Sequence, residues 1–497
     1  MKIKNEILIK NLNVILLIFI IFLIIYINYS SHVFHSDNGN LIRNSRFLLN
    51  EGSRNLIIKF HPPIPTYILS IFYLLNSDFN FILFNTISSI LIILVACKYF
   101  KNNLSITFFL LSIFFSFTFL DLGRYLAPYP LLFLFNFLSF YFLDRYYKIK
   151  NKSFLILSSI LSGFSLFIYG TALIFFTVPF FYIIFKDKKL NNKFNNLIIY
   201  YLILCMITLP WFIWHLKIGG IKYFYYYPLN FYIIKYLPYV NSNFWDYHRV
   251  FDFKYLTQFY NIYTTEIISA FYLTFLLISI IVYRKNLEMF FLMMILPVIP
   301  TLIAIVSPFS RYIYFTIIPS LIISSQGLYL SIKNSLRNMK IVLIFLFIIF
   351  LSLSIITFIS HFQESKNLWD IQYDDFKKFK NVINETNCFI FARFYSPQNM
   401  FDKNIFFIIL DFSEEDAISF LTSSEDEFIN ISRKYNICYF VTYKNIRRWE
   451  IEYYGWVPFY FNKDVTHYKN LESSGRIEKI YSGEVYNFYH LKNATTI

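Results

Sequence analysis

A polar stretch at residues 37–63 carries the side chains of this chain best suited to chemistry. It begins at Asp37, contains Lys59 and closes on His61-Pro62-Pro63. Apolar runs flank it on both sides, so a bilayer would hold it at one water interface. A partly desolvated carboxylate there can accept a proton from an attacking hydroxyl or hold a metal ion. Asp37 is therefore a candidate catalytic base, and the alternative is an ordinary loop aspartate.

A second connection, residues 121–128, brings another acid together with a base. It reads Asp-Leu-Gly-Arg-Tyr-Leu-Ala-Pro, which makes Asp121 a second catalytic candidate and Arg124 and Tyr125 candidates for substrate contacts. Two carboxylates and a guanidinium from separate loops suit the activation of a nucleophile and the neutralisation of a departing phosphate. Alternatively, Asp121 and Arg124 pair with each other at a helix start.

Other candidates for substrate contacts come from polar and aromatic loops. Lys59 could contact a phosphate or a sugar. His61 could be a ligand, an anion contact or a residue at the start of an interfacial helix over 64–75, whose first turn the prolines suit. Trp245 and His248 lie in a long aromatic loop that could stack on sugar faces, or form an aromatic belt at the membrane surface. No cofactor is required, although His61 or His248 with an acid could form a partial metal site.

Composition identifies the class of protein that must position these residues. Of the 497 residues, 57% are hydrophobic and only 15% are charged, which is far more apolar than a soluble domain. The net charge of +15 comes from short basic clusters between apolar runs. That pattern indicates membrane topology and excludes a nucleic-acid-binding surface.

Apolar runs of membrane-spanning length predict a polytopic α-helical membrane protein with about 11 transmembrane helices. The first is an uncleaved span, because no small-residue cleavage site follows it. The predicted spans are 12–27, 79–97, 104–120, 126–143, 154–168, 171–185, 197–214, 267–282, 290–306, 312–330 and 341–359.

The distribution of Lys and Arg predicts the orientation. With a cytoplasmic N-terminus, the inner connections carry the basic clusters, such as Arg145 to Lys152 and Lys186 to Lys193. The loops that hold Asp37, Asp121, Arg311 and Trp245 then share the outer face of the cell membrane.

The chain after the last span changes character. Residues 361–497 are mixed polar, with strand-like runs at 388–394, 405–410 and 437–442 and helical stretches at 374–382 and 413–434. This alternation predicts a small α/β extracytoplasmic domain beyond a transmembrane module of residues 1–360. Cys388 and Cys438 lie in this tail, and we expect two buried free thiols, with a disulfide as the alternative.

These motifs together resemble the glycosyltransferase C superfamily, in the branch of the protein O-mannosyltransferases and the lipid A aminoarabinose transferase. The resemblance is carried by Asp37 at the opening of the first outer loop, His61-Pro62-Pro63-Ile64 at its close, Asp121 after the third span, and Ser310-Arg311-Tyr312 with Pro319. The branch has an Asp-Glu pair where this chain has Asp37-Asn38, and often Lys-Gly where it has Tyr169-Gly170.

The resemblance implies transfer of one sugar from a polyprenyl-phosphate donor to an acceptor hydroxyl at the outer face, with inversion. Asp37 would be the general base, Asp121 would orient the sugar or acceptor, and Arg124 and Arg311 would hold the lipid phosphate. The acceptor could be a protein, a lipid or a glycan. Two alternatives are a transporter or polymerase of lipid-linked oligosaccharides and an inactive relative that keeps the scaffold. Ionisable residues at span ends on one face favour the enzyme, because transporters carry charges within spans or broken helices in matched halves.

Overall fold

The structure is a computed structural model, and it describes most of the helical bundle and much of the C-terminal region. The described residues are 2–29, 64, 67–68, 70–71, 79–114, 116, 119–120, 129–168, 172–224, 275, 310–383, 388–392, 406–407, 424–444 and 468–492.

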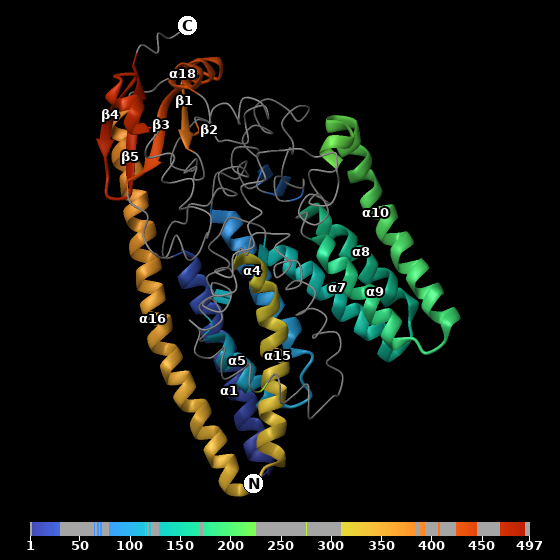
Figure 1. The fold of residues 1–497 in the computed structure, drawn as a ribbon. Coiled ribbons are helices and arrows are strands. Elements are labelled where there is room, and N and C mark those ends of the chain that lie inside the picture. Colours follow the sequence, from blue (N-terminus) through green and yellow to red (C-terminus); the bar gives the residue numbers. More distant parts are fainter. Residues whose placement is uncertain are drawn as a thin grey trace.

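Long apolar helices form the body of the molecule (Figure 1). Their sequences are apolar and suited to lipid, where a helix satisfies its own backbone hydrogen bonds. The helices are α1 (Lys2–Tyr29), α4 (Phe79–Cys97), α5 (Asn103–Phe114), α7 (Tyr129–Ile149), α8 (Lys152–Ile168), α9 (Ala172–Lys186), α10 (Leu190–Phe224), α15 (Ser310–Asn334) and α16 (Arg337–Val382).

These helices coincide with all but two of the predicted spans. The runs 267–282 and 290–306 lie outside the described residues, apart from the helical Phe275. Within the described part of the chain, three helical segments are long and apolar enough to cross a membrane: Glu6–Tyr29, Leu190–Pro210 and Arg337–Ser360. The total number of crossings therefore stays a prediction.

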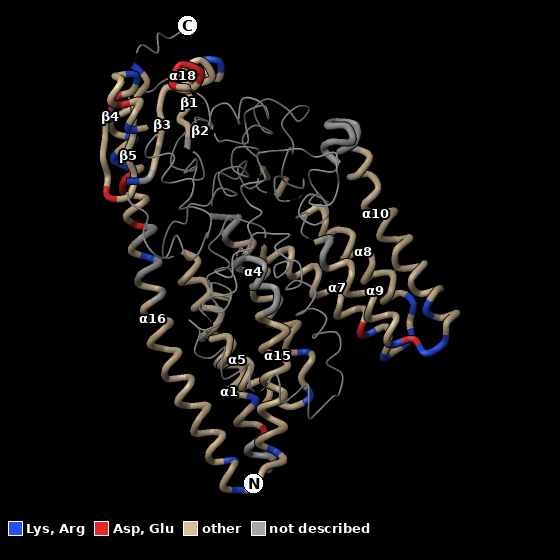
Figure 2. The backbone as a smooth tube through the Cα atoms, viewed as in Figure 1, with Lys and Arg blue, Asp and Glu red and all other residues tan. Residues whose placement is uncertain are grey.

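Successive helices alternate in direction, and the basic residues of the bundle gather at one end. Figure 2 shows Lys and Arg at the lower ends of the helices, where α7 joins α8, α9 joins α10 and α15 joins α16. The opposite end of the bundle lies below the sheet formed by the C-terminal residues (Figure 1). The basic clusters predict this separation between the basic connections and the sheet end of the bundle. Which end faces the cytoplasm stays a prediction.

Hydrogen bonds between small polar residues hold α7, α8 and α10 together. The Ser158 hydroxyl donates to the Ser139 carbonyl at 2.7 Å, and the Ser139 hydroxyl lies 3.3 Å from that of Tyr200. Gly163 lets α8 and α10 approach closely, because a Cβ there would lie 2.9 Å from the Cγ2 of Ile207. Small residues and hydroxyls at helix contacts are the usual means of packing helices in a membrane.

The last helix of the bundle continues into the C-terminal region without a break. α16 has 46 residues and contains neither proline nor glycine, so it extends roughly 69 Å, about twice the thickness of a bilayer core. The helical stretch predicted over 374–382 is confirmed, and these residues are the final turns of α16. The predicted boundary at residue 360 thus falls inside one continuous helix.

A five-stranded sheet packs against the end of α16. Its order is β2-β1-β3-β5-β4, with β1–β2 and β1–β3 parallel and the other pairs antiparallel. Phe376 and Phe379 of α16 cover one face of the sheet by packing on Phe488. The other face is covered by α18 (Glu425–Lys434) through Phe428, which packs on Phe440. The strands are β1 (Phe389–Ala392), β2 (Phe406–Phe407), β3 (Ile437–Tyr443), β4 (Ile477–Ser482) and β5 (Tyr486–Leu491).

Three of these strands fall on the predicted strand-like runs, whereas β4 and β5 were not predicted. The predicted helix over 413–434 is present as α18 in its second part, and residues 413–423 lie outside the described residues. The assignment of residues 361–497 as an extracytoplasmic domain stays a prediction.

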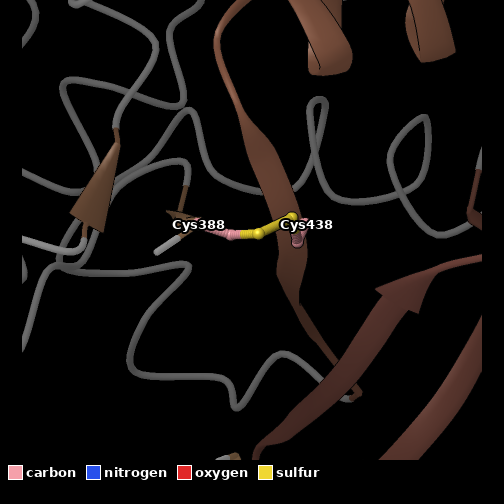
Figure 3. The surroundings of a disulfide bond; sticks show 2 residues. All are labelled: Cys388 and Cys438. Carbon is pink, nitrogen blue, oxygen red and sulfur yellow. A yellow bond between two sulfur atoms is a disulfide. The ribbon is translucent and has the colours of Figure 1, made fainter. Parts of the chain in front are cut away.

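A disulfide joins Cys388 and Cys438 at the start of the parallel strands β1 and β3 (Figure 3). The Cα atoms are 5.6 Å apart, because the two residues lie on neighbouring strands. The expectation of two free thiols is therefore wrong. Disulfides form and persist in oxidising compartments, so this bond favours the outer face for the sheet.

We expect loss of this disulfide to destabilise the sheet region. The cysteines are 50 residues apart, and the entropy of closing such a loop corresponds to about 4 kcal/mol. Cys388→Ser should therefore speed protease cleavage within residues 388–492 of the purified full-length protein. Cys97→Ser and Cys205→Ser, which replace the free cysteines, are the matched controls and should leave cleavage unchanged. Equal cleavage of Cys388→Ser and wild type would contradict the expectation.

Candidate functional site at the sheet end of the bundle

The end of the bundle below the sheet is where the predicted site segments attach. Figure 1 shows that α1 and α10 end there, and that α7 and α15 begin there. The segment 30–63 follows α1, the segment 121–128 precedes α7, and residues 225–309 connect α10 to α15. All the predicted site residues belong to these segments or to the first turn of α15. The fold thus brings their points of attachment to one end.

Most of the predicted site residues lie outside the described residues. These are Asp37, Lys59, His61, Asp121, Arg124, Tyr125, Trp245 and His248. For Arg311 the structure describes the backbone, which is that of the second residue of α15. Their roles and mutual distances therefore stay predictions.

Two helix N-termini add positive potential at this end. α7 begins at Tyr129, just after the segment that carries Arg124, and α15 begins at Ser310, beside Arg311. The first N–H groups of a helix have no partner within it, and its aligned peptide dipoles place partial positive charge at this terminus. Such termini are favourable for phosphate. The first described turns of α7 and α15 therefore suit an anion at this end of the bundle.

The amphipathic helix predicted after His61, over 64–75, is confirmed at those of its residues that the structure describes, while its position at the membrane interface stays a prediction. Ile64, Tyr67, Ile68, Ser70 and Ile71 are helical. Ile64 and Ile68 pack against the core of the bundle, whereas Tyr67 and Ile71 are 46% and 58% exposed. Spacings of four residues on each side are those of an amphipathic helix. Ile64 and Ile68 thus anchor the chain to the bundle directly after the polar segment 37–63.

Buried amides inside the bundle are polar features that the sequence reasoning missed. Asn28, in the last turn of α1, donates from Nδ2 to the Thr86 hydroxyl at 2.7 Å. Its Oδ1 is buried and accepts no hydrogen bond from the described residues. The same holds for the Oδ1 of Asn136, about two turns into α7. Buried acceptors normally have a donor, so both positions could receive an N–H or a hydroxyl. An amide within an apolar run was the signal that could have revealed them.

Nothing among the described residues forms a metal site. No three His, Cys, Asp or Glu side chains gather there in a group that could hold an ion. The candidates for a partial site, His61 and His248 with Asp37 or Asp121, lie outside that part of the chain.

Comparison with known proteins identifies the fold. No protein-family model matches the sequence, and no curated protein matches it. Among solved structures, ArnT from Cupriavidus metallidurans bound to undecaprenyl phosphate matches with a TM-score of 0.62 at 11% identity, over 97% of this chain and 98% of that one. The archaeal oligosaccharyltransferase AglB from Archaeoglobus fulgidus, in complex with an inhibitory peptide and a dolichol-phosphate, matches with a TM-score of 0.59 at 11% identity, over 92% of this chain and 72% of that one.

At such low identity these matches show the fold. The chain is a helical protein that shares the fold of ArnT and of the oligosaccharyltransferase AglB, and this is the fold that the predicted resemblance implies. The match to ArnT covers nearly the whole length of both chains.

Proposed function

We propose that this protein is an integral membrane glycosyltransferase that moves a sugar from a polyprenyl-phosphate donor to an acceptor hydroxyl. The donor carries a long isoprenoid tail, so its head group must lie at the membrane interface. We place the reaction at the outer face of the cell membrane, with the N-terminus of the chain in the cytoplasm. The acceptor is a protein, a lipid or a glycan.

The observation that carries this proposal is the convergence of the predicted site segments on one end of a bundle with this fold. The basic connections gather at the opposite end (Figure 2). The segments that carry Asp37, Asp121 and Arg124 adjoin α1 and α7 at the helix ends nearest the sheet, and Arg311 lies in the first described turn of α15 at the same end. An enzyme that releases a phosphate needs carboxylates and positive charge together at one interface.

The proposed reaction is a single displacement with inversion. Asp37 accepts the proton of the acceptor hydroxyl while the oxygen forms a bond to the anomeric carbon of the sugar. The bond between that carbon and the phosphate oxygen breaks, and its electron pair leaves with the polyprenyl phosphate. The phosphate gains one negative charge in this step, so cations beside it stabilise the transition state more than the ground state. Asp121 orients the sugar or the acceptor. The step uses no cofactor, and activity with and without a chelator tests for a divalent ion.

Arg311 is expected to contribute to the stabilisation of the leaving phosphate. Removing one such donor typically lowers kcat by about 10²-fold to 10³-fold. Arg311→Ala should therefore slow sugar transfer by about 10²-fold, and Arg311→Lys should restore part of the rate because it keeps the charge. Arg337→Ala is the matched control, because Arg337 begins α16 at the opposite end of the bundle. Transfer by Arg311→Ala within twofold of wild type would contradict this role.

The function itself is tested by transfer of labelled sugar from polyprenyl phosphate in membranes that carry the wild-type protein. Several sugars should be offered, and one of them should be transferred. Transfer of none would favour one of two alternatives, a transporter or polymerase of lipid-linked oligosaccharides or an inactive protein of this fold. The amide of Asn38, where the similar branch has a glutamate, is the observation behind the inactive alternative.

A further inference from the structure

At the end of the bundle opposite the sheet, two basic connections are joined into one surface. We call residues 144–152 and 186–193 the basic platform. The Tyr147 hydroxyl donates to Oδ2 of Asp187 at 2.8 Å, and the Tyr182 hydroxyl donates to Oδ1 of Asp144 at 3.1 Å. The first bond joins α7 to the α9–α10 connection, and the second joins α7 to α9. The platform holds eight basic and two acidic side chains, a net charge of +6.

Both acidic side chains of the platform accept hydrogen bonds from the platform itself and from residues that adjoin it. Asp187 is only 6% exposed, and its Oδ2 accepts hydrogen bonds from Tyr147 and from Nδ2 of Asn196, the latter at 2.7 Å. Asp144 accepts hydrogen bonds from Lys148 and from Tyr182. Asp144 thus pairs with the exposed Lys148, and Asp187 is buried against its hydrogen-bond donors. Lys150, Lys152, Lys188 and Lys189 are exposed and form no ion pair with any residue that the structure describes.

Lys150 shows that the charge is held in a defined place. Its ammonium group lies 4.6 Å from the ring centre of Tyr147 and 5.5 Å from that of Tyr146. Its φ of 61° is in the left-handed region, where glycine or asparagine is usual at a helix end. The cation–π contacts fix the ammonium above the same tyrosine that holds Asp187.

Large apolar side chains are exposed beside the lysines. Ile149, Phe185, Leu190 and Phe194 are each next to a lysine in the chain, and their exposed fractions are 54%, 64%, 66% and 58%. A soluble anion would make no favourable contact with these apolar side chains. A phospholipid contacts both groups, because its phosphate lies at the level of the ammonium groups and its acyl chains lie at the level of the apolar side chains.

We propose that the basic platform is a binding site for anionic phospholipid headgroups, in the membrane leaflet opposite the proposed catalytic end. Lys150, Lys188 and Lys189 contact the lipid phosphate, and Tyr146 and Tyr147 position Lys150. The buried Asp187 joins the two connections, so that their lysines act on the same headgroup region. This site does not depend on the proposed transferase activity.

The test uses the purified full-length protein in a neutral detergent and a fluorescent phosphatidylglycerol as the probe. The cluster variant is Lys150→Gln, Lys188→Gln and Lys189→Gln combined. Each lysine near an anionic lipid contributes about fivefold in affinity, so the variant should bind the probe at least tenfold and up to about 100-fold more weakly. The matched control is Lys333→Gln, Arg337→Gln and Lys340→Gln combined, which removes three charges from the α15–α16 connection at the same end of the bundle. It should bind as wild type does.

Each other outcome overturns the proposal. Equal loss in the cluster and control variants would mean that only the net charge of this end matters. If the wild-type protein bound phosphatidylcholine as tightly as phosphatidylglycerol, the apolar side chains alone would hold the lipid. If millimolar inorganic phosphate displaced the probe, the platform would be a site for soluble anions. Lys→Gln substitutions at exposed positions change the free energy of unfolding only slightly. An unchanged thermal unfolding temperature shows that the variant folds.

Discussion

Asp37→Asn is expected to lower sugar transfer by about 10²-fold to 10⁴-fold, while the protein accumulates in the membrane as the wild type does. Loss of a general base typically has an effect of this size, because the acceptor hydroxyl must then attack without proton removal. The amide has nearly the same shape as the carboxylate and cannot accept the proton at neutral pH. The measurement is the rate of labelled sugar transfer from polyprenyl phosphate, with substrates at saturation.

Glu51→Gln is the matched control for Asp37→Asn. Glu51 is the other acid of the segment 37–63, and its change removes the same charge from the same segment. We expect it to keep most of the activity. Equal transfer by Asp37→Asn and wild type would show that Asp37 is not the base, even if the protein is a transferase.

The second large effect is expected at Asp375, which fastens the sheet to α16. This carboxylate is 2% exposed and accepts backbone hydrogen bonds from Glu484, Val485 and Tyr486 at 3.0, 2.8 and 3.1 Å. The first two of these N–H groups belong to the turn between β4 and β5, and the third belongs to the first residue of β5. Asp375→Ala leaves them without their acceptor, and each such loss costs about 1–3 kcal/mol. We therefore expect Asp375→Ala to destabilise the attachment of the sheet by at least about 3 kcal/mol.

Limited proteolysis of the full-length protein measures this effect as faster cleavage within residues 468–492. Asp374→Ala is the matched control, since Asp374 is the exposed acid next to Asp375 on the same helix. Gly483→Ala tests the same contact from the other side, because a Cβ at Gly483 would lie 2.1 Å from Cγ of Asp375. We expect it to resemble Asp375→Ala. Cleavage of Asp375→Ala at the wild-type rate would show that the rest of the interface holds the turn.

The attachment also matters for the proposed function. Phe362 of α16 lies against Tyr26 of α1, with ring centres 6.0 Å apart, close to where the segment with Asp37 begins. Because α16 is continuous from the bundle to Phe379, the sheet is fixed relative to that end of the bundle. Loosening the sheet through Asp375 should therefore alter any acceptor contact that the sheet makes.

Local patterns in the sequence determined most of the helical architecture. The apolar runs predict the described helices, because a helix in lipid needs only its own residues to satisfy its backbone. The basic clusters predict which ends of the helices lie together, because charge is excluded from the bilayer core. The short β-branched and aromatic runs predict β1, β2 and β3. The motifs around Asp37, His61 and Arg311 predict the fold that the comparisons show.

Only the tertiary structure decided the features that join distant parts of the chain. The disulfide depends on the pairing of β1 with β3, which sets Cys388 beside Cys438. The Asp375 carboxylate meets a turn more than 100 residues later in the chain, and the basic platform depends on Tyr147 reaching Asp187. Hydrophobic periodicity indicates whether a residue faces a core. It does not indicate which residue of a distant element it contacts there. For that reason the sequence alone identified the end of the bundle that carries the candidate site. The structure showed how the sheet is attached above that end. It also showed that the exposed lysines of the basic platform lie together at the opposite end.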